Sequence, residues 1–116
     1  MTDSDIKAIV QLELAGEGFT LFRNNCGALK NQQGRLVRYG LHPGSSDLIG
    51  WAPHRIWPHE ADQIIARFVA IECKSHKDKL TPEQRKFLAS VRDSGGISQV
   101  AQEQKDGRIL RIDFEG

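Results

Sequence analysis

Apolar residues recur at helical spacing near the start of the chain and at strand spacing after it. The first group occupies five positions between residues 4 and 15: Ile6, Ile9, Val10, Leu12 and Leu14. This period predicts a helix that Asp3 or Ser4 caps and that ends at residues 16–18. Residues 19–23 then alternate between apolar and polar side chains, which predicts a strand followed by a turn.

The middle of the chain combines turn signals with one short apolar run. Glycine and proline recur after residue 27 and predict a long polar loop that lasts until Asp47. A second strand is expected from Asp47 to Trp51. The segment from Ala52 to His59 contains two prolines, too many for a helix, and is too long for a tight hairpin turn. We expect it to form a flap over the candidate site described below.

The second half of the chain predicts a strand, a helix and a further strand. Residues 67–74 are expected to form a third strand whose apolar part, residues 68–71, is buried. Thr81, Pro82 and Gln84 mark a helix start, with threonine at the cap, proline at the first helical position and glutamine three residues after the cap. The helix is expected to stop at residues 93–96 and to turn three side chains inward: Phe87, Leu88 and Val91.

The order of these elements predicts the fold class. A fourth strand is expected at residues 97–101, and the tail at residues 108–114 has the pattern of an edge strand. Helix, strand, strand, strand, helix and strand is an α/β order, with a mixed sheet flanked by helices.

The length and composition of the chain limit the class of protein to which it can belong. The 116 residues are 39% hydrophobic and 27% charged, which predicts a single globular domain over residues 1–116. The chain has no apolar stretch long enough for a membrane span, and its start lacks the pattern of a signal peptide, so we expect a cytoplasmic protein. A net charge of +1 gives no strong argument for a polyanionic partner. Cys26 and Cys73 lack metal-type spacing and are expected to be reduced thiols.

Two carboxylates and a lysine form the main candidate for chemistry. Glu72 and Lys74 lie two apart on a predicted strand and therefore share a face. Burying them is costly unless they pair or hold an ion. Magnesium prefers oxygen ligands, which Asp47, Glu72 and the backbone carbonyl of Cys73 would supply. Lys74 would orient the attacking water or neutralise charge, with Gln84 as a hydrogen-bonding support. This predicts a metal site for phosphodiester hydrolysis.

Simpler interpretations compete with this one. Glu72 and Lys74 alone would more often be a surface ion pair. For Gln84, a capping role beside Thr81 is weighed equally with support of the site. Trp51 is interpreted as packing rather than as a surface for base stacking. The four histidines have no metal-type spacing, and His76 is the one expected to touch phosphate.

Three segments carry a resemblance to a known family: Gly44-Ser45-Ser46-Asp47-Leu48-Ile49-Gly50, Ile71-Glu72-Cys73-Lys74-Ser75 and Gln84-Arg85-Lys86-Phe87-Leu88. They resemble the signature of the PD-(D/E)XK nuclease superfamily, and within it the VRR-NUC family, as in stand-alone phage and bacterial members. The resemblance implies a restriction-endonuclease-like core, dependence on Mg²⁺ or Mn²⁺, and cutting of branched DNA such as Holliday junctions. It also implies a homodimer, because related small resolvases pair two active sites.

The chain departs from the family pattern in two places. Ser46 stands where a proline usually precedes the motif aspartate. The family also supplies a further acid from the first helix, for which Asp3, Asp5 and Glu13 are available, and counting back from strand one favours Asp5 as a metal ligand.

Contacts with DNA are expected from residues in the loops around the motif. The predicted set contains six residues: Arg23, Asn25, Arg38, Ser46, His76 and Lys77. For Asn25, and for its neighbour Asn24, a turn after the first strand competes with a contact to DNA, and for Arg38 the competing role is solvation in a loop. Two further hypotheses stay open: a nucleic-acid-binding or scaffold module that lacks turnover, and a regulatory domain without a nucleic acid partner.

Overall fold

The computed structural model describes residues 1–56 and 63–116. Two helices lie in this part of the chain, α1 (Asp3–Gly16) and α2 (Pro82–Asp93). The strands are β1 (Thr20–Arg23), β2 (Gly27–Lys30), β3 (Leu36–Tyr39), β4 (Leu48–Arg55), β5 (Ile64–Lys74), β6 (Ile97–Glu103) and β7 (Ile109–Asp113).

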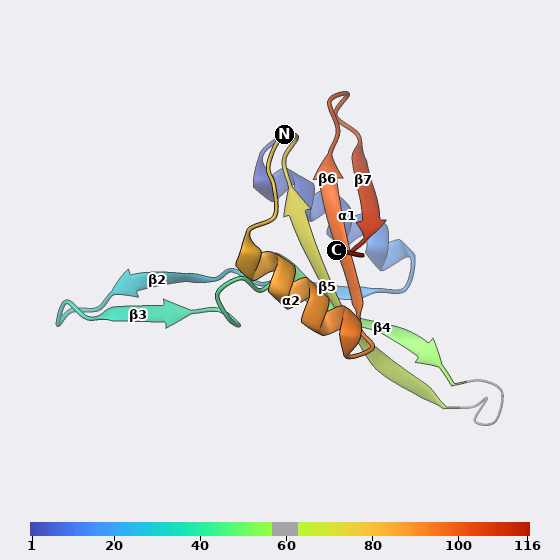
Figure 1. Ribbon diagram of the computed structural model, residues 1–116, viewed down its shortest axis with the longest axis horizontal. Coiled ribbons are helices and arrows are strands. Elements are labelled where there is room, and N and C mark those ends of the chain that lie inside the picture. Colours follow the sequence, from blue (N-terminus) through green and yellow to red (C-terminus); the bar gives the residue numbers. More distant parts are fainter. Residues whose placement is uncertain (57–62) are drawn as a thin grey trace.

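A mixed sheet of five strands forms the centre of the protein, in the order β1-β4-β5-β6-β7. Neighbouring strands are antiparallel except β5 and β6, which run parallel and are joined through α2. Helix α1 packs on β1 and β5, and α2 packs on β5 and β6 from the opposite face (Figure 1). This confirms the predicted mixed α/β architecture, which is compatible with a restriction-endonuclease-like core. The tail forms β7 at the edge of the sheet, as predicted.

The alternation of side chains along β5 explains how two helices cover one sheet. Val69, Ile71 and Cys73 point into the core beneath α1, together with the buried face of that helix. Ala70 points to the other side, where it packs with Leu88 of α2. Because residues two apart share a face, Glu72 and Lys74 lie on the α2 side of the strand.

Both helices begin with a capping box. Helix α2 has the predicted arrangement: Thr81 Oγ1 accepts the N–H of Gln84, and Gln84 Oε1 accepts the N–H of Thr81. Helix α1 uses Thr2 as its cap, in reciprocal hydrogen bonds with Asp5, so the expectation of Asp3 or Ser4 was wrong by one or two positions. The Thr2 hydroxyl can cap a helix as a serine hydroxyl does. Among the adjacent candidates Thr2 is selected because Asp5, three residues later, returns a hydrogen bond to its N–H.

The predicted long polar loop was wrong. It contains the antiparallel hairpin of β2 and β3, which forms a sheet of its own and extends away from the central sheet (Figure 1). Each strand has only four residues. Because the hairpin packs on no core, its apolar side chains are exposed and leave little alternation to recognise.

Strands β4 and β5 are longer than the sequence suggested. β4 continues through Pro53 to Arg55, paired with β5, so the first half of the expected flap is strand. Ile56 donates its N–H to the carbonyl oxygen of Gln63, and residues 57–59 of the expected flap lie outside the described residues. Burial also differs at Phe68, which is exposed although the residues after it are buried. No helix in the two described ranges is long and apolar enough to cross a membrane.

Candidate active site

The two predicted acids meet where β4 begins and β5 ends. Leu48 pairs with Ile71 in the antiparallel register, so the residues just before and just after this pair are neighbours. Asp47 precedes β4, and Glu72 follows Ile71. A hydrogen bond ties the two strands at this point, because the N–H of Cys73 donates to Asp47 Oδ2 over 2.8 Å.

Glu72 is buried, with 2% of the residue exposed. Its Oε1 accepts a hydrogen bond of 2.9 Å from Gln84 Nε2, and Lys74 Nζ lies 3.8 Å from the same oxygen. Its Oε2 is buried and has no hydrogen-bond partner among the described residues. One oxygen of this carboxylate is therefore held by protein groups, while the described part of the chain supplies no donor to the other.

The surroundings of Glu72 disfavour its charged form. Burial is the main cause and the neighbouring negative charge of Asp47 the next, and together they raise the pKa of Glu72 to about 8, while Lys74 acts in the opposite direction. The same causes raise the pKa of the Cys73 thiol to about 12. A divalent cation between Asp47 and Glu72 would offset both the cost of burying the Glu72 charge and the repulsion between the two carboxylates.

Helix α1 contributes a cation that sequence reasoning missed. Lys7 Nζ lies 3.6 Å from Asp47 Oδ1, and both side chains are partly exposed. A single lysine beside the apolar face of a helix usually indicates a solvated position. The signal that could have found it is its place one residue after buried Ile6, which turns it toward the edge of the sheet.

Gln84 performs both roles that its sequence context suggested. Its Oε1 belongs to the capping box, and its Nε2 reaches Glu72. The amide group thus joins the first turn of α2 to the buried carboxylate.

Asn24 fixes the loop that carries Asp47. Its Nδ2 donates to Ser45 Oγ over 2.7 Å and to the carbonyl oxygen of Ser46 over 3.0 Å, and its Oδ1 accepts the N–H of Leu41 over 3.2 Å. The sequence suggested a turn or a contact with DNA at this asparagine. The structure shows instead a residue that positions the segment before Asp47.

Two of the first-helix acids differ in their interactions. The Asp5 carboxylate is exposed and accepts the N–H of Thr2 in the capping box, which is the main reason why the pKa of Asp5 is lowered. The charge of Asp3 is one of those that raise the pKa of Cys73, so its field reaches the end of β5.

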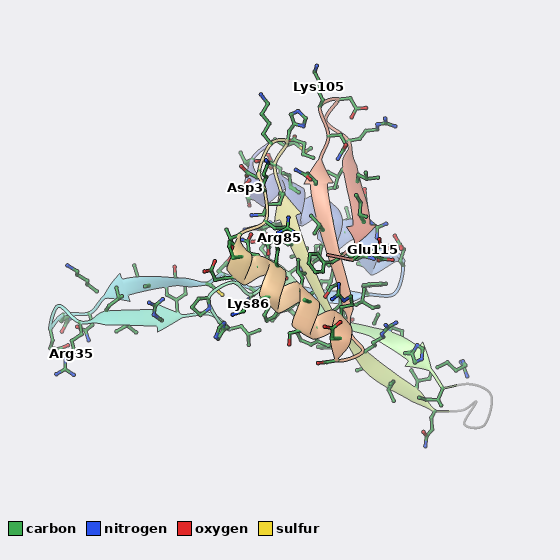
Figure 2. The ribbon with its side chains drawn as sticks, in the orientation of Figure 1. Asp3, Arg35, Arg85, Lys86, Lys105 and Glu115 are labelled. Carbon is green, nitrogen blue, oxygen red and sulfur yellow. The ribbon has the colours of Figure 1, made fainter. Side chains whose placement is uncertain are left out.

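The residues predicted to contact DNA are dispersed. Arg23 donates to Ser4 Oγ and to the Ser4 carbonyl oxygen, which holds it against the start of α1. Ser46 is fully buried. Asn25 is exposed between β1 and β2, and Arg38 is exposed on β3, in the hairpin whose tip carries Arg35 (Figure 2).

A cavity of about 620 Å³ lies beside Lys74, and its walls carry basic side chains together with four acidic ones: Asp78, Glu103, Asp113 and Glu115. His76 and Lys77, both exposed, line it together with Lys79 and Arg85. Among the described residues, none of these four forms an ion pair with a carboxylate. These four side chains can therefore contact phosphate groups, whereas the acidic side chains of the same cavity repel them.

A sequence model for the VRR-NUC domain matches residues 8–104 of the chain. The chain belongs to the VRR-NUC family. This is a nuclease family of the PD-(D/E)XK-like superfamily, and the predicted membership is confirmed. No curated protein matches the chain significantly. In this VRR-NUC domain the fold brings Asp47, Glu72 and Lys74 together at the ends of β4 and β5.

A metal fits this centre in chemical terms. The unpartnered oxygen of Glu72 is of the kind that Mg²⁺ and Mn²⁺ bind, and the Asp47 carboxylate lies beside it. Within the described part of the VRR-NUC domain, no group of three or more His, Cys, Asp and Glu side chains is assembled for a metal ion. With two carboxylates, the remaining ligands would come from the Cys73 carbonyl, water and substrate phosphate, as is usual for magnesium.

Proposed function

We propose that this VRR-NUC domain is a metal-dependent DNA endonuclease that uses Mg²⁺ or Mn²⁺ and cuts branched DNA such as Holliday junctions. The observation that supports it best is the buried Glu72, whose Oε2 has no hydrogen-bond partner within residues 1–56 and 63–116 and whose neighbour is a second carboxylate. A protein keeps such an arrangement at a cost in stability, and a bound cation explains it.

The roles of the residues follow from their contacts. Asp47 and Glu72 would hold the metal, with the Cys73 carbonyl as a further ligand, and Asp5 remains a prediction for the fourth position. The bound metal would lower the pKa of a water molecule and offset charge on the phosphate. The Lys74 ammonium, near Glu72, would orient that water and stabilise the charge that builds on the phosphate. Gln84 would keep Glu72 in place through Oε1, leaving Oε2 directed to the metal.

The branched substrate and the homodimer rest on the family resemblance. Lys74, His76 and Lys77 line one cavity beside the two acids, and these three side chains support passage of a phosphate backbone there. A dimer would place two such sites on one junction, with one cut in each of two strands.

Cleavage tests this function directly. Four-way junction, flap, nicked duplex and plain duplex are incubated with the protein in Mg²⁺ or Mn²⁺, and products are resolved on a denaturing gel. Lys74→Ala is expected to reduce cleavage by at least about a hundredfold while the fold is retained. Lys105→Ala is the matched control, since Lys105 lies at the tip of the β6–β7 hairpin (Figure 2).

Three outcomes would contradict the proposal in different ways. Undiminished cutting by the Lys74 variant would contradict the proposed role of Lys74 in the cleavage step. Binding of junctions without product in either metal would identify a scaffold module. A monomer in light scattering at micromolar concentration would argue against paired cutting.

A further inference from the structure

Helix α1 brings a positive charge to the candidate active site. Lys7 Nζ lies 3.6 Å from Asp47 Oδ1, with 22% of the lysine side chain and 23% of the aspartate side chain exposed. Solvent and substrate therefore reach this pair from outside. Lys74, a second cation of the centre, belongs to β5 and lies beside Glu72. The two lysines thus come from different elements and neutralise different acids.

Both oxygens of Asp47 have a positively polarised neighbour. Oδ2 accepts the N–H of Cys73 over 2.8 Å, and Oδ1 faces the Lys7 ammonium. A carboxylate oxygen that accepts one hydrogen bond keeps a further lone pair, so Asp47 can still share a metal ion. An ion bound on the Oδ1 side, however, would lie close to the ammonium and be repelled by it.

Glu72 has different surroundings. Its Oε1 accepts the hydrogen bond from Gln84 and faces Lys74, whereas its Oε2 is buried without a partner among the described residues. The centre thus contains one carboxylate oxygen to which the described part of the chain brings neither a donor nor a cation. These contacts leave a place for one ion, at Glu72 Oε2 and shared with Asp47.

A second divalent ion would need ligands that this centre does not assemble. Two-metal centres hold their ions about 3.5–4 Å apart, on either side of the reacting phosphate. Asp3, Asp5 and Glu13 of α1 belong to the described residues, and within these residues no group of three or more His, Cys, Asp and Glu side chains is assembled for a metal ion. At Asp47, α1 provides an ammonium instead.

We infer that the centre binds a single divalent ion, and that the Lys7 ammonium supplies at Asp47 the positive charge that a second ion supplies in a two-metal nuclease. This inference rests on the proposed function, because it concerns the metal of the same site. It gives Lys7 a role that differs from that of Lys74, which is paired with Glu72.

The test counts bound metal ions in the absence of DNA. Mn²⁺ is titrated into the protein, and electron paramagnetic resonance measures the free ion, which yields the number bound per chain and the dissociation constant. The wild type is expected to bind one Mn²⁺ per chain. Its bound-state spectrum should lack the spin coupling that two neighbouring Mn²⁺ ions produce. Glu72→Gln should lose this ion, which locates it at the candidate active site.

Lys7→Glu should create the missing second site. A glutamate oxygen stands one bond closer to the backbone than the lysine nitrogen, which leaves space for an ion between the new carboxylate and Asp47. The variant is expected to bind two Mn²⁺ per chain and to show the coupled spectrum. Lys105→Glu makes the same change of charge at the tip of the β6–β7 hairpin and should still bind one ion (Figure 2). Circular dichroism verifies that the variants are folded.

Lys7→Met separates the loss of the ammonium from the gain of a ligand. It adds no oxygen, so the number of bound ions should stay at one while the affinity rises about two- to fivefold. This variant also decides the inference if Lys7→Glu does not fold. Unchanged or weaker affinity in Lys7→Met would overturn the role of Lys7.

The other contrary results concern the number of ions. Two Mn²⁺ bound by the wild type with affinities within about tenfold of each other would overturn the inference, and so would a single ion in folded Lys7→Glu. If the wild type binds one Mn²⁺ as expected and cuts no DNA, the inference stands and the nuclease proposal fails. Cleavage by a wild type that binds two ions would have the opposite meaning, and no binding of Mn²⁺ would overturn both.

Discussion

Gln84 donates from Nε2 to Glu72 Oε1 over 2.9 Å while its Oε1 accepts the N–H of Thr81. One amide group therefore connects the start of α2 to the buried acid. The orientation of the amide is fixed by the capping box, so the donor end necessarily faces Glu72. Stability of the helix and order of the site depend on the same side chain.

Gln84→Glu should separate these two roles. A glutamate still accepts the Thr81 N–H, so the helix start is retained. It replaces the donor to Glu72 with a second negative charge, which should raise the pKa of Glu72 and reduce cleavage about tenfold or more. Gln84→Ala should in addition lose the hydrogen bond from the Thr81 N–H, at a cost of about 1 kcal/mol, while Thr81 still caps the helix. Urea unfolding and cleavage rates, measured on both variants, distinguish the effects; equal activity of wild type and Gln84→Glu would contradict the role.

The metal-free protein should become less stable as pH rises. The pKa of Glu72 is raised to about 8 in the folded protein, mainly by burial, from 4.5 in the reference state. Protonation is thus easier in the folded state, so stability is complete below pH 4.5 and declines as pH rises through 8. Glu72→Gln, which cannot ionise, should show a flatter profile in EDTA. Adding Mg²⁺ at pH 8 should stabilise the wild type and have little effect on Glu72→Gln.

Lys7→Met should bind divalent metal more tightly. The Lys7 ammonium lies 3.6 Å from Asp47 Oδ1, where it opposes a second cation. Because both groups are partly exposed, the gain should be modest, about two- to fivefold in affinity. Calorimetric titration with Mn²⁺ measures it, and Lys105→Met is the control. Weaker binding in Lys7→Met would show that Lys7 organises the acid rather than competing for it.

Asn24→Ala should loosen the segment before Asp47. Its side chain makes three hydrogen bonds to that loop, and their loss is expected to cost about 1–3 kcal/mol in the free energy of unfolding. The neighbouring Asn25→Ala is a matched control, because Asn25 is exposed and should leave stability unchanged. Similar unfolding midpoints for the two variants would contradict this assignment.

Gly50→Ala should disrupt the pairing of β1 with β4. A Cβ at this position would lie 1.8 Å from the backbone oxygen of Thr20, which cannot move without breaking the ladder. The expected loss exceeds about 3 kcal/mol. Gly16→Ala, with open space around the added atom, should be neutral or slightly stabilising. Thermal unfolding of the two variants provides the comparison.

The sequence predicted the parts of the site that follow from local periodicity. Glu72 and Lys74 share a face because strands alternate, and Gln84 was placed by the capping box that starts α2. Lys7 escaped prediction because its contact with Asp47 depends on how α1 packs against the sheet. Asn24 was ambiguous for a similar reason, since turn asparagines are common and its partners lie more than fifteen residues away.

The fold was predictable where apolar side chains enter a core. Residues 4–15 and 81–93 indicated the helices because their buried faces repeat at helical spacing. The β2–β3 hairpin could not be recognised in this way, since its faces lie outside the core. Phe68 was predicted to be buried because it belongs to an apolar run, but it is exposed. It lies where α2 does not cover the sheet, and burial on this face depends on that helix.

The hairpin of β2 and β3 begins and ends at neighbouring points of the central sheet. Arg23, the last residue of β1, pairs with Leu48, the first residue of β4, so residues 24–47 leave and rejoin the sheet at one place. The side chain of Asn24 holds the two ends of this segment together through its hydrogen bonds to Ser45 and Ser46. The hairpin is therefore an insertion whose length and sequence can change without altering the register of the strands that carry Asp47 and Glu72. A different hairpin at this place could therefore change how far the protein extends along its substrate, or how tightly it binds it, while the strands that carry Asp47 and Glu72 stay the same.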